Sequence, residues 1–256
     1  MRTKRLLVIM IAAVFVLAAV FSFILIFSVK KVDVTYSVDQ NTNVSEVQDK
    51  LDKYIGKNLM FVDLEEVESI VKAFPKYKVV SSSKKYPNVI TLKVEERRVV
   101  YQYTYQDNVY GLDKEGFVVS STPVSDWAVK DGEIIALDFS GVDVLSVAVG
   151  DYLKTSQNEL LACVLDMALS VRLTDCINKI TVYKNLDFND AVFYTDTGVT
   201  ITIEDVLNRG VEKIVKGFES YDNAGDYIKS YNHIKVYLDQ KNDQIVSILS
   251  NTNEGD

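Results

Sequence analysis

The chain begins with a long apolar run and then changes to short elements of alternating or helical pattern. From Leu6 to Val29 there is no charged residue, and the only polar side chains are two serines. A run of this length and composition can cross a hydrocarbon core as a helix. We therefore predict a transmembrane helix over residues 6–29. Three basic residues stand among residues 1–5, which places this short tail in the cytoplasm and the rest of the chain outside.

A cleaved signal peptide is the competing interpretation, since it also starts with positive charge and an apolar stretch. The run is longer than a signal core of roughly 7–15 residues, and no small-x-small pair precedes Lys30 and Lys31. These two lysines weaken the charge asymmetry across the run. The balance favours an uncleaved anchor.

The next seventy residues predict a compact α+β unit, which we assign to residues 30–98. Alternating Val32, Val34 and Tyr36 indicate a strand, and two amphipathic helices follow. Two further strands, "YKVVSSSKK" and "VITLKVEE", flank a Tyr86-Pro87-Asn88 turn. The order strand, helix, helix, strand, strand lets a three-stranded sheet bury one face under both helices.

Both helices carry start signals, a buried stripe and stop signals. Asn43 with Glu46, and Asp63 with Glu66, have the spacing of capping boxes. Gly56 and Pro75 end the helices. The apolar residues at helical spacing are Val44, Val47, Leu51, Tyr54 and Ile55 in the first helix, and Leu64, Val67, Ile70, Val71 and Phe74 in the second.

Residues 99–249 predict a mixed, β-rich domain with two helices, and residues 250–256 a flexible polar tail. Tyr101, Tyr103 and Tyr105 alternate on one face of a strand. The helices are expected over 156–173 and 204–220. The remaining strands are "EIIALDFSGV", "INKITVYKN", "DAVFYTDTGVTITI" and "HIKVYLDQKNDQIVSIL", with turns at 113–116 and 197–198.

Composition narrows the class of partner. The chain has 256 residues, of which 48% are hydrophobic, and this is enough to bury a core. Its net charge is −8. No basic stripe runs along it, so nucleic acid is not an expected partner. The excess of acid also disfavours general adhesion to an anionic membrane surface.

The sequence lacks the residues that a catalytic or metal site would need. The single histidine, His233, is remote in sequence from Cys163 and Cys176, which argues against a nucleophilic triad or dyad. These three residues are too few and too scattered for zinc, and 185–190 and 239–243 lack the Gly and Glu of a calcium loop. We expect no catalytic residue, metal or cofactor. A disulfide between the two cysteines remains open, although Cys163 fits a buried free thiol.

The strand "YPNVITLKVEER" ends in a cluster of charge. Ile90, Leu92 and Val94 share one face, so Glu95 and Glu96 point to opposite faces and cannot act together as an acid and a base. We interpret Glu96 as a carboxylate at the rim of the core. Glu96, Arg97 and Arg98 together are the expected domain junction.

The first extracytoplasmic unit resembles the POTRA domain of the FtsQ/DivIB family of bacterial cell-division proteins. The residues that carry the resemblance are the turn Gly56-Lys57-Asn58-Leu59, a helix ending in Phe74-Pro75, and the strand from Tyr86 to Arg97. The likeness continues in "VYGLDKEGFVV" and, more weakly, in "VFYTDTGVTITIEDVLNRGVEKI". Arg98-Val99-Val100 and Thr197-Gly198 depart from the family pattern, which usually has Pro and a small residue at the first place and Asp-Gly at the second.

The resemblance implies a non-catalytic divisome scaffold at the division septum. Such proteins bind single-pass partners of the FtsB/DivIC and FtsL type and couple division-site assembly to septal peptidoglycan synthesis. An edge strand of the β domain would accept a partner strand. We place that edge at 233–238, with partner-binding candidates Tyr231, Ile234, Val236, Tyr237 and Leu238.

Three alternatives stay open. The strand at 233–238 could be internal and bind no partner, because sequence does not reveal edge status. The chain could be an accessory protein of secretion or adhesion that carries a POTRA domain. A cell-wall enzyme would share the topology but would need a catalytic pair, and none is found in the sequence.

Overall fold

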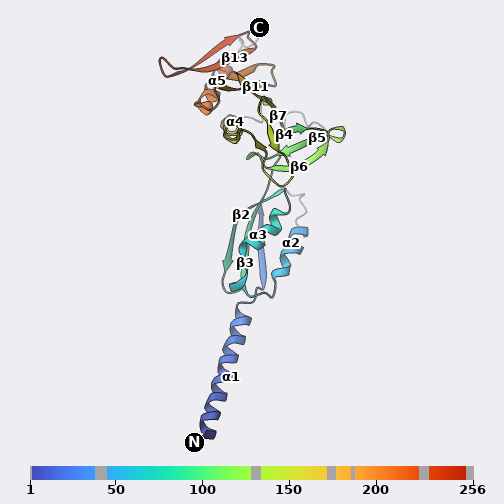
Figure 1. Cartoon of the computed structure of the whole chain (residues 1–256), viewed down its shortest axis with the longest axis vertical. Coiled ribbons are helices and arrows are strands. Elements are labelled where there is room, and N and C mark those ends of the chain that lie inside the picture. The colour runs from blue at the N-terminus through green and yellow to red at the C-terminus, as the bar shows by residue number, and fades with distance from the viewer. Residues whose placement is uncertain are drawn as a thin grey trace. The chain divides into compact units, whose positions relative to one another are not determined.

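The computed structural model describes residues 2–37, 45–127, 134–171, 177–185, 188–224 and 231–251. The chain divides into two compact units between Arg97 and Arg98. The first unit holds the apolar helix and a small α+β domain, and the second holds a large mixed sheet with helices (Figure 1). This is the α+β class predicted from the pattern of elements.

Helix α1 spans Arg2–Ile26. Its most apolar window, Ile9–Ile26, has a mean hydropathy of 3.0 over 18 residues, so the helix is long and apolar enough to cross a membrane. No part of this window is buried in the protein. A core helix would bury its apolar side chains, whereas a helix that faces lipid exposes them.

The sheet of the first unit has the order β1-β3-β2. Its strands are β1 Lys31–Ser37, β2 Tyr77–Lys85 and β3 Val89–Glu96. β3 lies in the centre, parallel to β1 and antiparallel to β2. The three predicted strands are therefore confirmed.

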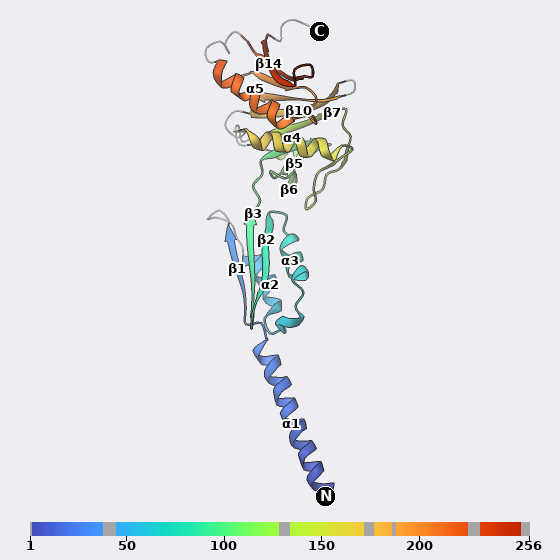
Figure 2. The ribbon, with the colours of Figure 1, turned by 90° about the vertical axis from the view of Figure 1, so that its left-hand side faces the viewer.

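Two short helices cover one face of this sheet (Figure 2). They are α2 Ser45–Leu51 and α3 Leu64–Lys72, joined through 3-10 turns η1 Asp52–Tyr54 and η2 Leu59–Phe61. The Asp63 carboxylate caps α3, where it accepts a hydrogen bond of 2.9 Å from the Glu65 N–H. The other predicted cap, Asn43, lies outside the described residues.

The core of the first unit is the apolar stripe that the sequence indicated. Val67 and Val71 of α3 pack on Ile90, Leu92 and Val94 of β3, and all five side chains are fully buried. One assignment is wrong. Ile55 was expected in the buried stripe of the first helix, but α2 ends at Leu51 and the Ile55 side chain is 50% exposed. The 3-10 turn η1, which follows α2 directly, breaks the helical period between these residues.

The second unit is built on a nine-stranded mixed sheet with the order β14-β13-β12-β11-β10-β7-β4-β5-β6. The strands are β4 Tyr101–Tyr105, β5 Asn108–Leu112, β6 Val118–Pro123, β7 Ile135–Ser140, β10 Ile177–Asn185, β11 Phe188–Thr195, β12 Thr200–Ile203, β13 His233–Asp239 and β14 Gln244–Ser250. A separate ribbon pairs β8 Val144–Ser146 with β9 Lys154–Thr155. A 3-10 turn, η3 Val124–Asp126, follows β6.

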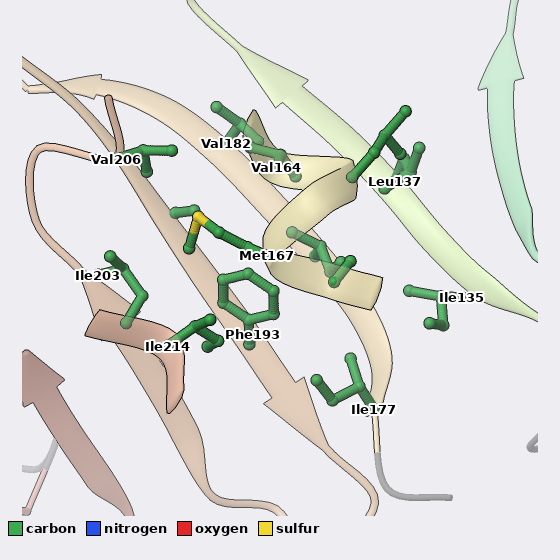
Figure 3. Close-up of a cluster of buried hydrophobic side chains, with 14 of the residues drawn as sticks. Ile135, Leu137, Val164, Met167, Ile177, Val182, Phe193, Ile203, Val206 and Ile214 are labelled. Atoms are coloured by element: carbon green, nitrogen blue, oxygen red, sulfur yellow. The ribbon is translucent and has the colours of Figure 1, made fainter. Parts of the chain in front are cut away.

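Helices α4 Asn158–Ser170 and α5 Gly210–Ala224 lie on one face of this sheet (Figure 2). Val164 and Met167 of α4, Phe193 of β11 and Ile214 of α5 meet in the buried core between them (Figure 3). The predicted start of the second helix at Glu204 is wrong. Residues 204–209 form a turn segment, in which Asp205 and Arg209 have positive φ angles of 49° and 57°.

Candidate functional site

The strand predicted to be the edge of the large sheet is not its edge. β13, at residues 233–239, pairs in parallel with β12 and antiparallel with β14, so it is an internal strand. β14 is the terminal strand at this end of the sheet. The prediction missed this because the chain turns at residues 240–243 and residues 244–250 then form one more strand, which pairs with β13.

The side chains proposed for partner binding separate into two groups. Ile234 and Val236 point into the core under α5 and are 1% and 0% exposed, so they form no part of a surface. Tyr231 is 39% exposed. Tyr237 and Leu238 are half-buried and line a cleft of about 240 Å³ at the end of β13. Partner binding by these three residues stays a prediction.

The backbone of β14 has an inward set and an outward set of polar groups. The Val236 carbonyl accepts a hydrogen bond of 3.0 Å from the Glu204 N–H, so the Val236 backbone faces β12. Backbone direction alternates along a strand, and the antiparallel partner of Val236 is Ser247. The N–H and C=O groups of Ser247, and those of Ile245 and Leu249, therefore point away from β13.

The composition of β14 gives it no protection against pairing. Its sequence QIVSILS holds no charged residue and no proline. Exposed edges are commonly blunted by Lys, Pro or bulges. The opposite edge strand, β6, shows these devices: it ends in Pro123 and contains a register shift, and the Val118 backbone bonds to Gly150 and Asp151.

The cleft beside β13 is bounded by a loop that one buried lysine holds in place. Lys213 is 1% exposed, and its ammonium donates to the carbonyls of Glu204 at 2.7 Å and Asp205 at 3.0 Å. Burial lowers the pKa of Lys213, and the nearby carboxylates of Asp205, Glu204 and Asp190 oppose that shift. The buried Asp190 carboxylate accepts from the Asp205 N–H at 2.9 Å. These bonds hold the loop 204–209, in which Asp205 and Arg209 have positive φ angles.

The chemistry-bearing residues of the β domain are engaged in structural contacts. His233 Nδ1 lies 2.8 Å from the Thr200 hydroxyl oxygen, and burial, followed by the charge of Lys235, lowers its pKa. Cys163 is a free thiol that donates to the Val206 carbonyl at 3.2 Å, and burial raises its pKa. Cys176 lies outside the described residues. Within the described ranges, no three His, Cys, Asp or Glu side chains are grouped to hold a metal ion.

Comparison with known protein families identifies the type of the first domain. Residues 27–97 match the family model described as the POTRA domain, FtsQ-type. The first unit carries an FtsQ-type POTRA domain, which supports an FtsQ/DivIB family protein. The match supports a division-related membrane protein, and it ends one residue before the predicted end of the POTRA domain at Arg98. A search of curated proteins found no match to the chain.

The family motif Gly56-Lys57-Asn58-Leu59 joins the POTRA domain to the end of α1. Gly56 has φ +87°, and its N–H donates to the Val29 carbonyl at 2.9 Å. The Asn58 side chain accepts from the Met60 N–H at 2.9 Å and so caps the turn η2. Leu59 is fully buried, and its N–H donates to the Phe27 carbonyl at 2.7 Å. Each of these three residues thus has a structural role in this FtsQ-type domain.

The predicted junction residues lie at the end of the POTRA sheet. Glu96 is half-buried and pairs with Tyr77 across β2 and β3. The Arg97 N–H donates to the Lys76 carbonyl at 2.8 Å, which continues the pairing of β2 and β3 past Glu96. Arg98 is exposed and begins the second unit. A hinge role for this cluster stays a prediction.

Proposed function

We propose that this protein is a non-catalytic scaffold of the division machinery. It binds small single-pass division proteins of the FtsB/DivIC and FtsL type outside the membrane, at the septum, and couples their assembly to septal peptidoglycan synthesis. The observation that carries the proposal is the unprotected edge strand β14. Its outward backbone groups at Ile245, Ser247 and Leu249 can pair with one more strand.

Side chains beside this edge supply selectivity. Ile248 is 46% exposed and lies across from Lys235, on the sheet face opposite α5. Tyr237 lies across from Val246 on that same face. Large half-exposed aromatic and aliphatic side chains next to a free backbone edge are the usual anchors of strand addition. Tyr231, Tyr237 and Leu238 therefore remain proposed partner contacts, now beside the edge and not within it.

A pair of proline substitutions tests the edge. Ser247→Pro removes an outward N–H from β14 and leaves the bonds to β13 in place. Ser121→Pro is the matched control, because Ser121 lies two positions before Pro123 in β6 and shares its outward orientation. A photoreactive residue at Ile248 of the full-length protein reports the contact in living cells.

The proposal expects crosslinks from Ile248 to a protein of the FtsB/DivIC or FtsL type. Ser247→Pro should abolish these crosslinks and produce filamentous cells, whereas Ser121→Pro should do neither. Equal crosslinking in both proline variants would contradict the edge assignment.

Depletion separates the alternative functions. Filaments with unclosed septa support a division scaffold. Normal septa with altered secretion would instead favour an accessory role in transport or adhesion. Wall-lytic activity of the purified full-length protein would favour an enzyme.

A further inference from the structure

The POTRA unit exposes large apolar side chains at one end. Among the residues of this unit that the structure describes outside α1, the exposed large apolar ones are Ile55, Met60, Phe61, Val80 and Tyr86, and Phe61 is the most exposed at 84%. All except Val80 lie on the turns 55–61 and 86–88. We call Ile55, Met60, Phe61 and Tyr86 the membrane-proximal tip. A phenylalanine so exposed, with apolar neighbours, indicates a surface that contacts something other than water.

Hydrogen bonds place these turns beside the end of α1. The Leu59 N–H donates to the Phe27 carbonyl at 2.7 Å, and the Lys57 carbonyl accepts from the Val29 N–H at 2.8 Å. The second turn is held in the same way, since the Asn88 carbonyl accepts from the Lys30 N–H at 2.9 Å. The rings of Phe27 and Tyr86 are in edge contact, with centroids 6.2 Å apart. The tip is therefore continuous with the anchor helix.

The length of the anchor sets the depth of the tip. A helix rises about 1.5 Å per residue, so a hydrocarbon core of about 30 Å takes up roughly 20 residues. With Arg5 at the inner boundary, the outer boundary falls near Leu25 and Ile26. Phe27 and the turns bonded to it then lie in the headgroup layer. Aromatic and aliphatic side chains at this depth bury their apolar parts while their polar atoms stay hydrated.

The charge near the tip is opposite in sign to that of the whole chain. The protein carries −8. Around the tip, however, Lys30, Lys57 and Lys85 are exposed, and Lys84 donates to the Met60 carbonyl at 3.3 Å. The acidic residues near the two turns are Asp52, Asp63 and Glu66, and the Glu66 carboxylate lies near Lys57 and pairs with Lys53 at 3.6 Å, so the lysines remain in excess. A basic rim around an apolar tip is suited to an anionic bilayer, and each lysine near such a surface adds to the attraction.

We propose that the membrane-proximal tip inserts into the headgroup layer of an anionic bilayer, on the side of the membrane where the POTRA domain lies. The lysines around it contact lipid phosphates, and Phe61 reaches furthest toward the acyl chains. The inference rests on the anchor staying in the membrane and not on the proposed division partners.

Fluorescence quenching by brominated lipid tests this contact in the full-length protein. Trp127 is the only tryptophan and lies in the β domain, so Trp127→Phe gives a silent background. In that background Phe61→Trp places a single probe at the tip. Val80→Trp is the matched control, because Val80 is also exposed, on β2, five residues before the strand ends at Lys85. Both variants are reconstituted in phosphatidylglycerol vesicles that contain brominated phosphatidylcholine.

We expect quenching at position 61 to be at least about twofold stronger than at position 80. Quenching no stronger than in the control overturns the proposal. Adding Lys57→Glu and Lys85→Glu should reduce quenching of the Phe61 probe in anionic vesicles but not in neutral ones; an equal reduction in both would overturn the role of the lysines. A photoreactive residue at Phe61 should form lipid adducts in cells. Adducts with a protein alone would assign the tip to a partner and overturn contact with lipid.

Discussion

The two domains differ in what they bury. In the POTRA domain the buried side chains among the described residues are aliphatic or aromatic, from Val29 to Val94 of β3. The β domain buries polar and charged side chains as well, namely Asp113, Thr155, Asp190, Thr195, Thr202 and Lys213. One domain is held by periodic apolar packing, and the other also depends on polar bonds that close its loops.

The polar residues of the β domain bond to backbone at turns. Asp113 accepts from the N–H groups of Glu115 at 2.8 Å and Phe117 at 2.9 Å. The Thr195 hydroxyl donates to the Val199 carbonyl at 2.8 Å and accepts from its N–H at 3.0 Å. Buried polar groups of this kind stabilise one loop conformation because an unmade bond costs more than a made bond contributes.

The largest effect should come from the apolar core. Leu92→Ala removes a fully buried side chain from the central POTRA strand and should lower the free energy of unfolding of that domain by roughly 3 kcal/mol. Hydrogen exchange measured by mass spectrometry on the full-length protein in micelles resolves the two domains. Protection should fall in β1–β3 and stay unchanged in β10–β13. Val80→Ala, at an exposed site, is the control; equal loss in both domains would contradict their independence.

Lys213→Met tests how much the β domain depends on a buried polar residue. It keeps most of the apolar stem but leaves the carbonyls of Glu204 and Asp205 without their donor, which should cost the β domain about 2 kcal/mol. Trp127 fluorescence follows this unfolding, since the probe lies in the β domain. Lys216→Met is the control, because that lysine on the same helix is exposed and pairs only with Glu219 at 3.2 Å among the contacts described. A similar loss in both variants would refute the special role of Lys213.

The same difference explains which parts of the fold the sequence could predict. The POTRA strands and α3 could be predicted because their buried apolar residues recur every two positions in a strand and every 3.6 positions in a helix. The helix expected from Glu204 failed because Lys213 and Asp190 hold residues 204–209 as a loop. No local pattern reports such bonds, which join residues 8 to 15 positions apart.

The candidate site was predicted only in part. The sequence placed the partner edge in the last stretch of the sheet, and Tyr231 and Tyr237 do lie near the terminal strand. It could not distinguish β13 from β14, because both are short runs rich in apolar residues. The signal that could have separated them is "DQKND", where Asp239 accepts from the Lys241 N–H at 3.0 Å and Asp243 has φ +50°, the marks of a hairpin turn. Strand pairing is a long-range property that neither strand encodes alone.

A smaller effect is expected at the Asp113 turn, which belongs to the family-like stretch "VYGLDKEGFVV". Asp113→Ala leaves the N–H groups of Glu115 and Phe117 without the bonds that the carboxylate accepts, and should cost about 1–2 kcal/mol. Asp113→Asn keeps an acceptor oxygen and should recover more than half of that loss. Urea midpoints of Trp127 fluorescence measure both variants. If Asn were as damaging as Ala, the negative charge and not the acceptor geometry would be what matters.

The smallest effect concerns pH and separates the two domains, because the only histidine lies in the β domain. Burial and Lys235 lower the pKa of His233 below 6.5, so the folded state favours the neutral ring. As the pH falls through 6.5 toward this lowered pKa, the unfolded chain takes up the proton first, and the β domain loses stability. Carboxylates such as Glu212, whose pKa is lowered by a hydrogen bond from Arg209, lose their contribution only at more acidic pH.

The loss between pH 7.5 and 5.5 should be well under about 1 kcal/mol, since the ring is only half-buried. His233→Asn keeps a polar atom near the Thr200 hydroxyl and does not titrate, so it should flatten the dependence of the β-domain urea midpoint on pH. The POTRA domain has no histidine and should show a flat midpoint in both proteins. A slope that persists in the Asn variant would place the titrating group elsewhere and remove His233 from the comparison.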